Sequence, residues 1–386
     1  MLQLFINTDF QKAWLEKLFE KEASFKERAP EIDEHAVFPK QNIQELIDMG
    51  YTKLTLPQSY GGDGARVTDM ILFQETLASF DANTALSIGW HLGGTGDIFE
   101  EKLWKEESLR FFADEVLKGA LVNRAVSEAQ TGSPTRGGRP GTQAIRRNGN
   151  WVISGRKNFT TMSPALTYFL TSAWIEEKQS IGFFLIHKDS EGLSIEETWD
   201  VISMRGTGSH DLVLEDVAVE DEMLVEIPDG ARGNKPNGWI LHIPAAYLGI
   251  AQAARDYAIK FANEHSPNSI KGPISQLPNV QHHIGEIDLE LMRARHFIYS
   301  VAQAYDDPAR RPFITNELGA VKHTVTNAAI NIVDKAMRLV GAKSLQRTNP
   351  LQMYYRNVRA GLHNPPMDDM TISKLAMTAI EQAKNK

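Results

Sequence analysis

The segment that decides the fold reads AVSEAQTGS over residues 125–133. Its first two residues are typical of a β-strand, and the rest is a loop of small and hydroxylated residues. Loops of this composition present backbone N–H groups and hydroxyls to an anionic or heteroaromatic ligand. The segment by itself also fits a plain surface loop, so its neighbours in the chain must decide between the two interpretations.

Two polar segments of a similar kind follow it. The first reads ISGRKNFTT over residues 153–161, where the ring of Phe159 can stack on a flat ligand while Thr160 and Thr161 hydrogen-bond to the ligand's edge. The second reads MRGTGSHD over residues 204–211, and its two glycines permit close approach of the backbone to a ligand. The alternatives are a strand with a core phenylalanine and an ordinary connection between strands.

Residues 121–226, which include these segments, have the sequence pattern of a β-domain. Asn148 and Gly149 stand between two strand-like runs and favour a two-residue hairpin turn, because both central positions of that turn need positive φ. Short strands at such spacing predict a small antiparallel barrel or sandwich. The further strand-like runs are residues 168–175, 181–187, 193–197 and 211–219.

Helical periodicity occupies the chain on both sides of this zone. A helix capped by Asp9 opens the first side, and a second helix ends at Gly50. On the other side, apolar residues recur at helical spacing without heptads, which indicates a bundle. The fold class is therefore α+β and mostly α. It divides into an N-terminal helical domain (1–120), a middle β-domain (121–232) and a C-terminal four-helix bundle (233–386), whose helices are expected at 247–261, 280–305, 316–340 and 371–383.

Composition excludes several classes of function. The 386 residues include no cysteine, so disulfides, thiolate metal sites and cysteine nucleophiles are excluded, and no other metal cluster is expected. A net charge of −8 argues against nonspecific nucleic-acid binding. The first ten residues carry no secretory signal, and the apolar stretch 238–254 fits a buried helix better than a membrane span. We expect a cytoplasmic protein without a membrane span.

The three polar segments, in this order and between helical zones, resemble the acyl-CoA dehydrogenase superfamily. Residues 127–133 resemble the family's Thr-Glu-Pro-Gly-Ala-Gly-Ser loop, and residues 159–161 resemble its Trp-Ile-Thr triplet. The resemblance covers most of the chain and implies an FAD between the β-domain and the bundle, usually in a homotetramer. Further matching segments are residues 202–219, 248–254 and 273–281.

The resemblance also implies which residues bind the flavin. Ser127 is expected near the flavin's reactive edge and Ser133 near its pyrophosphate, and Gly341 lies in a segment resembling one that reaches a neighbouring subunit's FAD. Arg205 and Ser209 are expected to bind substrate, with a structural salt bridge as the alternative for Arg205. The complete expected set for the cofactor is Ala125, Ser127, Gly132, Ser133, Phe159, Thr160, Thr161 and Gly341.

The chain departs from the family at the catalytic base. An acyl-CoA dehydrogenase removes a proton α to a thioester, and this requires a carboxylate within hydrogen-bond reach. Pro365 stands about where the usual glutamate is expected, and residues 239–241, WIL, stand where a subset of the family keeps its base. Asp368 or Asp369 can supply a displaced base, although a turn or cap role fits them as well.

The segment expected to hold the cofactor also departs from the family. Residues 265–269, HSPNS, replace the Arg-x-x-Phe-Gly segment that commonly holds a neighbouring FAD. FMN or a loosely held reduced flavin is therefore an alternative to FAD.

Two histidines point to another branch of the same fold. His91, in residues 89–92, and His363, in residues 356–365, lie in segments that resemble flavin monooxygenases of the dibenzothiophene monooxygenase type. Imidazole can donate or accept a proton near neutral pH, which suits oxygen chemistry on reduced flavin. A hydrogen-bonded core residue is the alternative for His91, and a turn residue is the alternative for His363.

The sequence thus predicts a flavin-dependent oxidoreductase that acts on an acyl-CoA or a similar small organic substrate. A two-component monooxygenase that uses reduced flavin and O2 is the alternative. A dehydrogenase needs an electron-transfer partner, and a monooxygenase needs a separate flavin reductase. A third interpretation is a flavin- or acyl-thioester-binding protein without turnover.

Overall fold

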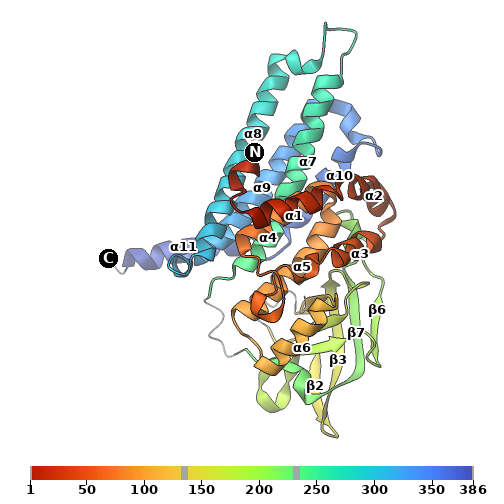
Figure 1. Cartoon of the computed structure of the whole chain (residues 1–386), viewed down its shortest axis with the longest axis vertical. Coiled ribbons are helices and arrows are strands. Elements are labelled where there is room, and N and C mark those ends of the chain that lie inside the picture. Colours follow the sequence, from red (N-terminus) through yellow and green to blue (C-terminus); the bar gives the residue numbers. More distant parts are fainter. Residues whose placement is uncertain (1, 132–137, 229–234, 385–386) are drawn as a thin grey trace.

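A computed structural model of the chain describes residues 2–131, 138–228 and 235–384. Long helices run side by side at one end, a β-sheet forms the other end, and the N-terminal helices lie across the region between them (Figure 1). One continuous apolar core links the N-terminal helices, a face of the sheet and the long helices. The predicted order of helices, then strands, then helices is confirmed.

The N-terminal helices begin and end at local signals. Thr8 caps the first helix by accepting from the Gln11 N–H, and the Gln11 side chain accepts from the backbone N–H of Thr8 in return. The expected helix near residues 41–49 forms one residue earlier and is followed by Gly50 in the left-handed region. These helices are α1 (Asp9–Phe19), α2 (Glu22–His35), α3 (Lys40–Asp48), α4 (Val67–Phe80), α5 (Ala82–Glu100) and α6 (Glu106–Leu117).

The strands form one connected sheet in the order β6-β7-β3-β2-β4-β5-β8, with β1 paired to β4. Asn148 and Gly149 have φ of 52° and 89° and connect β2 to β3, so the predicted hairpin turn is confirmed. The strands are β1 (Val122–Ala125), β2 (Gln143–Arg147), β3 (Asn150–Thr160), β4 (Tyr168–Ile175), β5 (Ser180–His187), β6 (Leu193–Glu196), β7 (His210–Val219) and β8 (Leu224–Glu226).

The sheet is not wholly antiparallel. β1 and β2 both pair with β4 in parallel, which the prediction of an antiparallel domain missed. Parallel pairing needs a long crossover between strands. The chain returns from β2 to β4 through β3, which runs antiparallel to β2, so β2 and β4 meet although no local turn joins them.

Three long helices make up most of the C-terminal region. α4 from the N-terminal region packs against α7 and α8, so this bundle draws on both ends of the chain. α11 forms where the fourth helix was expected, but it projects from the body, and within its described residues Thr371 is the buried one (Figure 1). The C-terminal helices are α7 (His242–Glu264), α8 (Pro278–Asp306), α9 (Thr315–Val340), α10 (Pro350–Asn357) and α11 (Asp368–Lys384).

A buried ion pair joins α4 to α8. Arg295 donates from Nε and Nη2 to Glu75 Oε1 at 2.8 and 2.5 Å, and the Tyr299 hydroxyl donates to Glu75 Oε2 at 3.0 Å. Both charged side chains are only 1% exposed. Since neither charge can reach water, each depends on the other, and the pair fixes how the two helices align.

We expect Glu75→Ala to destabilise the protein strongly, because it leaves the Arg295 guanidinium buried without its counter-charge. Breaking one side of such a pair typically costs about 3–5 kcal/mol. Chemical denaturation measures the loss. Asp9→Ala is the matched control, since Asp9 forms an exposed ion pair with Lys12, and such pairs contribute at most about 1 kcal/mol. Equal losses in the two variants would contradict this account of the helix junction.

Candidate functional site

The structure brings the three polar segments together at one corner of the sheet. The Asn158 N–H donates to the Ser127 carbonyl at 2.8 Å, which joins the end of β3 to the loop after β1. The Met162 N–H donates to the Thr207 carbonyl at 2.9 Å, which joins the same end of β3 to the short 3-10 helix η6 (Arg205–Thr207). Residues about 80 positions apart in the chain therefore form one surface.

A buried ion pair fixes the loop after β1. Lys157 Nζ donates to Glu128 Oε1 at 2.5 Å and to Ser172 Oγ at 3.1 Å, and the lysine is fully buried. Glu128 also accepts the N–H groups of Gly141 and Thr142 at 2.6 and 3.1 Å. Burial raises the pKa of Glu128, but Lys157 and the other donors outweigh it and hold that pKa below its ordinary value. Lys157 therefore serves as a structural ion-pair partner.

Phe159 is placed as an exposed aromatic platform. Its φ is 56°, and its ring is 66% exposed and edge-on to Trp199 at 6.1 Å between centroids. An exposed ring in this position can stack on a flat ligand.

Unpartnered polar atoms occur in the residues immediately before and after Phe159. Asn158 Oδ1 and Thr160 Oγ1 are buried, and within the described residues neither has a hydrogen-bond partner. Buried polar atoms are normally satisfied, so each one without a partner needs an explanation. A flavin ring offers donors and acceptors along one edge, and this set of residues fits it.

Thr161 and Ser209 are also brought together. Their hydroxyl oxygens are 2.9 Å apart, and Ser209 Oγ is 2.8 Å from Thr207 Oγ1. Ser209 was expected at the substrate, whereas its hydroxyl is engaged by these two threonines. Thr207 was not predicted, because nothing in the sequence shows that its hydroxyl meets the other two.

Arg205 lies away from these hydroxyls. Its guanidinium donates to the carbonyls of Asp33 at 2.7 Å and Val201 at 3.0 Å, and so ties η6 to the end of α2. A cation at the C-terminus of a helix is favoured by the exposed carbonyls there. The geometry favours a structural role for Arg205 over substrate binding.

The remaining expected cofactor residues take different positions. Ala125 is 1% exposed and pairs with Thr171 in the sheet, so its side chain is part of the core. Gly341 ends α9 with φ of 71°, and a Cβ there would meet nothing within 4 Å. Gly132 and Ser133 lie outside the described residues.

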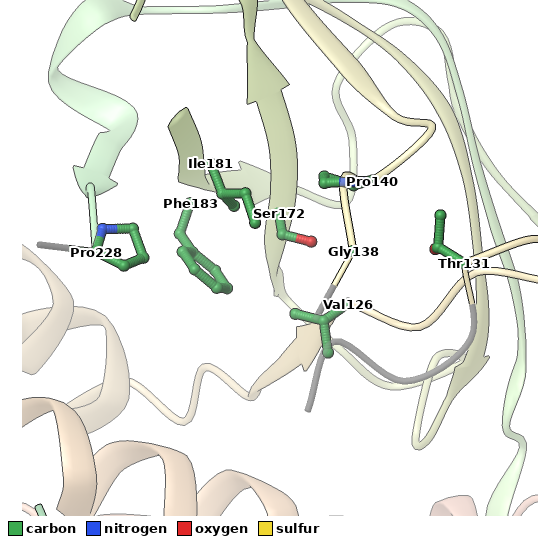
Figure 2. A pocket seen from close by; sticks show the side chains of 8 residues that line it. All are labelled: Val126, Thr131, Gly138, Pro140, Ser172, Ile181, Phe183 and Pro228. Atoms are coloured by element: carbon green, nitrogen blue, oxygen red, sulfur yellow. The ribbon is translucent and has the colours of Figure 1, made fainter. Parts of the chain in front are cut away.

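A small cavity borders the same loop. It holds about 140 Å³ and its walls are mostly apolar. Figure 2 shows Ser172 among the lining residues, with Phe183 and Pro140 on either side of it. Pockets that enclose whole cofactors or drug-sized ligands are several times larger. This cavity cannot hold a flavin ring and extends the corner on the side of residues 125–133.

The two histidines differ sharply in environment. His91 is fully buried, with Nε2 2.8 Å from the Thr52 carbonyl and Nδ1 accepting the Val122 N–H at 3.1 Å. These partners assign the proton to Nε2. Burial lowers the pKa of His91 to about 4, so the ring is neutral near pH 7. The geometry favours the core role for His91. His363 is exposed beyond the end of α10.

Residues other than carboxylates occupy the two positions where a catalytic base was expected. The ring of Trp239 packs on Gly96, where a Cβ would lie 2.5 Å from it, and Trp239 Nε1 donates to Glu100 at 2.8 Å. Glu100 also accepts from the Tyr305 hydroxyl at 2.5 Å. A tryptophan thus fills the space at the start of the bundle and engages the neighbouring carboxylate.

Near Pro365, the displaced-base candidate Asp368 is held by donors. Asn327 Nδ2 donates to it at 2.9 Å, and the buried ammonium of Lys322 lies 3.5 Å away. Asp368 also begins α11, where a carboxylate favours the helix N-terminus. The geometry favours a cap role for Asp368, and Asp369 next to it is exposed.

Two global properties complete the description. Over residues 2–131, 138–228 and 235–384, three or more histidine, aspartate or glutamate side chains nowhere gather as they would around a metal ion. Within the same ranges no helix combines the length and apolar character needed to cross a membrane.

Comparison with family models covers most of the chain. The acyl-CoA dehydrogenase N-terminal domain matches residues 10–102, the middle domain matches residues 123–217 and the C-terminal domain matches residues 241–362.

Individual relatives extend this match. YdbM of Bacillus subtilis (strain 168), named only provisionally as an acyl-CoA dehydrogenase, is 62% identical over 98% of this chain and all of its own. L-evernosamine nitrososynthase of a Micromonospora species is 27% identical over 86% of this chain and 81% of its own. Among solved structures, KijD3 in complex with dTDP superposes with a TM-score of 0.85 at 25% identity, and the match covers 97% of each chain.

We expect His91→Gln to flatten the fall in stability between pH 7 and pH 5. The pKa of His91 is depressed by folding, so the unfolded chain binds the extra proton, and stability is lost as pH falls below the unfolded value of about 6.5. With the folded pKa at about 4, this residue accounts for about 2 kcal/mol of that loss. Urea denaturation at the two pH values measures it.

His363→Gln is the matched control, because the ring of His363 is exposed. It should leave the pH dependence as in the parent protein. An unchanged pH dependence in His91→Gln would show that the ring of His91 does not have the buried, neutral environment described above.

Proposed function

The chain belongs to the acyl-CoA dehydrogenase family, whose members are flavin-dependent oxidoreductases, and on that premise we propose that it binds a flavin at the corner formed by Ser127, Phe159 and Thr161. The exposed ring of Phe159 supports this placement, as do the unpartnered atoms of Asn158 and Thr160. FAD is the flavin expected of the family. FMN is the alternative, because residues 265–269 do not match the segment that commonly holds a neighbouring FAD. When bound, the flavin supplies two-electron transfer and, once reduced, reactivity towards O2.

The reaction that the geometry supports best is oxidation of a small organic substrate by reduced flavin and O2, with a separate flavin reductase as the electron source. The observation that carries it concerns the base. Glu100, which binds Trp239, and Asp368, which follows Pro365 by three residues, are both engaged by hydrogen-bond donors. The oxygens of these carboxylates are directed to donors of the protein itself, so neither is presented as a base for a proton on a substrate. The nitrososynthase relative adds support, since forming a nitroso group places oxygen on nitrogen.

Dehydrogenation of an acyl-CoA is the second candidate. It is supported by the 62% identity to a relative named provisionally for that activity. This reaction would pass the electrons to an electron-transfer partner, and it would require a base other than the two carboxylates just described.

We also propose that the chain forms a homotetramer. A helix as long as α11 is marginal by itself in water, and most helical stability in proteins comes from packing of an apolar face. Yet Ile372, Met377 and Ile380 of α11 are 53%, 59% and 56% exposed in the isolated chain. A second copy of the chain is the partner that would cover them.

The flavin placement predicts that Phe159→Ala weakens flavin binding about tenfold, because loss of an aromatic stacking contact costs about 1 kcal/mol or more. Fluorescence titration with FAD and with FMN measures the effect. Phe313→Ala is the matched control, since Phe313 is 80% exposed on another part of the surface. A native protein that binds neither flavin would overturn the proposed function.

The proposed reaction predicts that acyl-CoA thioesters leave the bound flavin oxidised in the absence of air. Without a general base the rate is lower by a factor of about 10²–10⁴. Anaerobic stopped-flow absorbance with straight-chain acyl-CoAs of several lengths measures bleaching, and the reduced protein is then mixed with O2. Fast bleaching by an acyl-CoA would establish the dehydrogenase candidate instead.

The assembly predicts that replacing Ile372 and Ile380 together by glutamate lowers the oligomeric state. Buried carboxylates without partners are costly, so the α11 contact would be lost. Light scattering at micromolar concentration reports the mass. Glu381→Gln, an exposed change on the same helix, is the control. A monomeric native protein would contradict the assembly.

A further inference from the structure

The cavity beside the loop after β1 combines apolar walls with a buried hydroxyl. Ile181 and Phe183 of β5, Val126 and two prolines form the apolar walls, and Ser172 of β4 lies among them (Figure 2). The cavity holds about 140 Å³, and an engineered apolar cavity of about 150 Å³ in another protein binds benzene. One ring of that size therefore fits here.

The Ser172 hydroxyl is able to donate to a ligand. Lys157 Nζ donates to Ser172 Oγ at 3.1 Å, and an ammonium has no lone pair with which to accept in return. Burial lowers the pKa of Lys157, but the Glu128 carboxylate, 2.5 Å from Nζ, opposes this and favours the ammonium. Within the part of the chain that the structure describes, the proton of Ser172 has no acceptor.

The other hydroxyl in the cavity wall is in a different state. Thr131 donates to Glu128 Oε2 at 3.4 Å, so its proton is used inside the protein. Ser172 is 4% exposed, and a buried donor without an acceptor costs free energy. An acceptor atom on a ligand in the cavity would remove that cost.

We infer that this cavity binds a small ring with one uncharged hydrogen-bond acceptor, which lies at Ser172 while the ring packs on Phe183. The Arg124 guanidinium lies 5.0 Å from the centre of the Phe183 ring and supports it from the protein side. A carboxylate on the ligand fits less well, because Glu128 already balances the charge of Lys157 and the walls are apolar. The inference is independent of the proposed flavin site.

The experiment compares two probes, benzonitrile and toluene, on the full chain. The two molecules are almost equal in size, and only benzonitrile carries an acceptor. Saturation-transfer NMR titrations measure both dissociation constants. The nitrile stretching band of bound benzonitrile gives a second measurement, because a hydrogen bond from Ser172 moves it to higher frequency than in an apolar solvent.

Ser172→Ala removes the donor and leaves room for the ring. We expect benzonitrile to weaken about fivefold to tenfold relative to toluene, since one hydrogen bond is lost. A purely structural role of Ser172 would weaken both probes equally. Thr142→Val is the matched control, because Thr142 donates to Glu128 at 2.8 Å in the same network but does not line the cavity. Its ratio of the two constants should be that of the native protein.

Ile181→Trp fills the cavity at a distance from the Lys157 network, and it should abolish binding of both probes. Binding that survives in Ile181→Trp places the ligand elsewhere and overturns the inference. An unchanged ratio in Ser172→Ala, an unshifted nitrile band, or a native protein that binds neither probe overturns it as well. The nitrile band of the native protein decides the matter if Ser172→Ala does not fold.

Flavin titration of the same samples separates this inference from the proposed function. Flavin binding without probe binding overturns the inference alone, and probe binding without flavin binding overturns the proposed function alone.

Discussion

The buried ion pair between Lys157 and Glu128 is the interaction on which the flavin corner depends. An ammonium without access to water is tolerated only beside an opposite charge, so β3 and the loop after β1 must lie together. Once they do, the Asn158 N–H reaches the Ser127 carbonyl, and the buried Oδ1 of Asn158 is left without a partner, among the described residues, at the corner that we assign to the flavin. The residues that touch a ligand are thus positioned by residues that do not.

The sheet is held to the helices by a second set of polar contacts. Asn357 Oδ1 accepts the Met204 N–H at 2.7 Å, and Arg356 forms an ion pair with Asp33. The first contact joins the segment before η6 to α10, and the second joins α10 to α2 from the opposite end of the chain. The same segment leads directly into η6, so the docking of the helices also fixes the position of η6 at the corner.

The chemistry follows from which charged groups remain free. Two carboxylates of the helical region are engaged by donors: Glu75 binds Arg295 and Tyr299, and Glu100 binds Trp239 and Tyr305. These contacts stabilise the packing of α4 and α5 against α8, and they engage Glu100, the carboxylate that binds Trp239 at the start of the bundle. This chain has the fold of thioester dehydrogenases, but the polar groups of its proposed site are mainly hydroxyls and amides. Such groups suit recognition of a ring better than removal of a carbon-bound proton.

The sequence by itself determined the order of helices, strands and helices, the hairpin at Asn148, and the segments that form the site, because periodicity and turn preference are local properties. It also determined that glutamate is missing at Pro365 and near Trp239. Only the tertiary structure decided the roles of individual side chains. His91 accepts from the backbone of β1, and Arg205 ties η6 to α2, through partners far away in the chain. Sequence analysis also did not predict that β4 pairs in parallel with β1 and β2, or that α11 projects from the body. Long-range pairing and burial depend on which surfaces meet after the chain has folded.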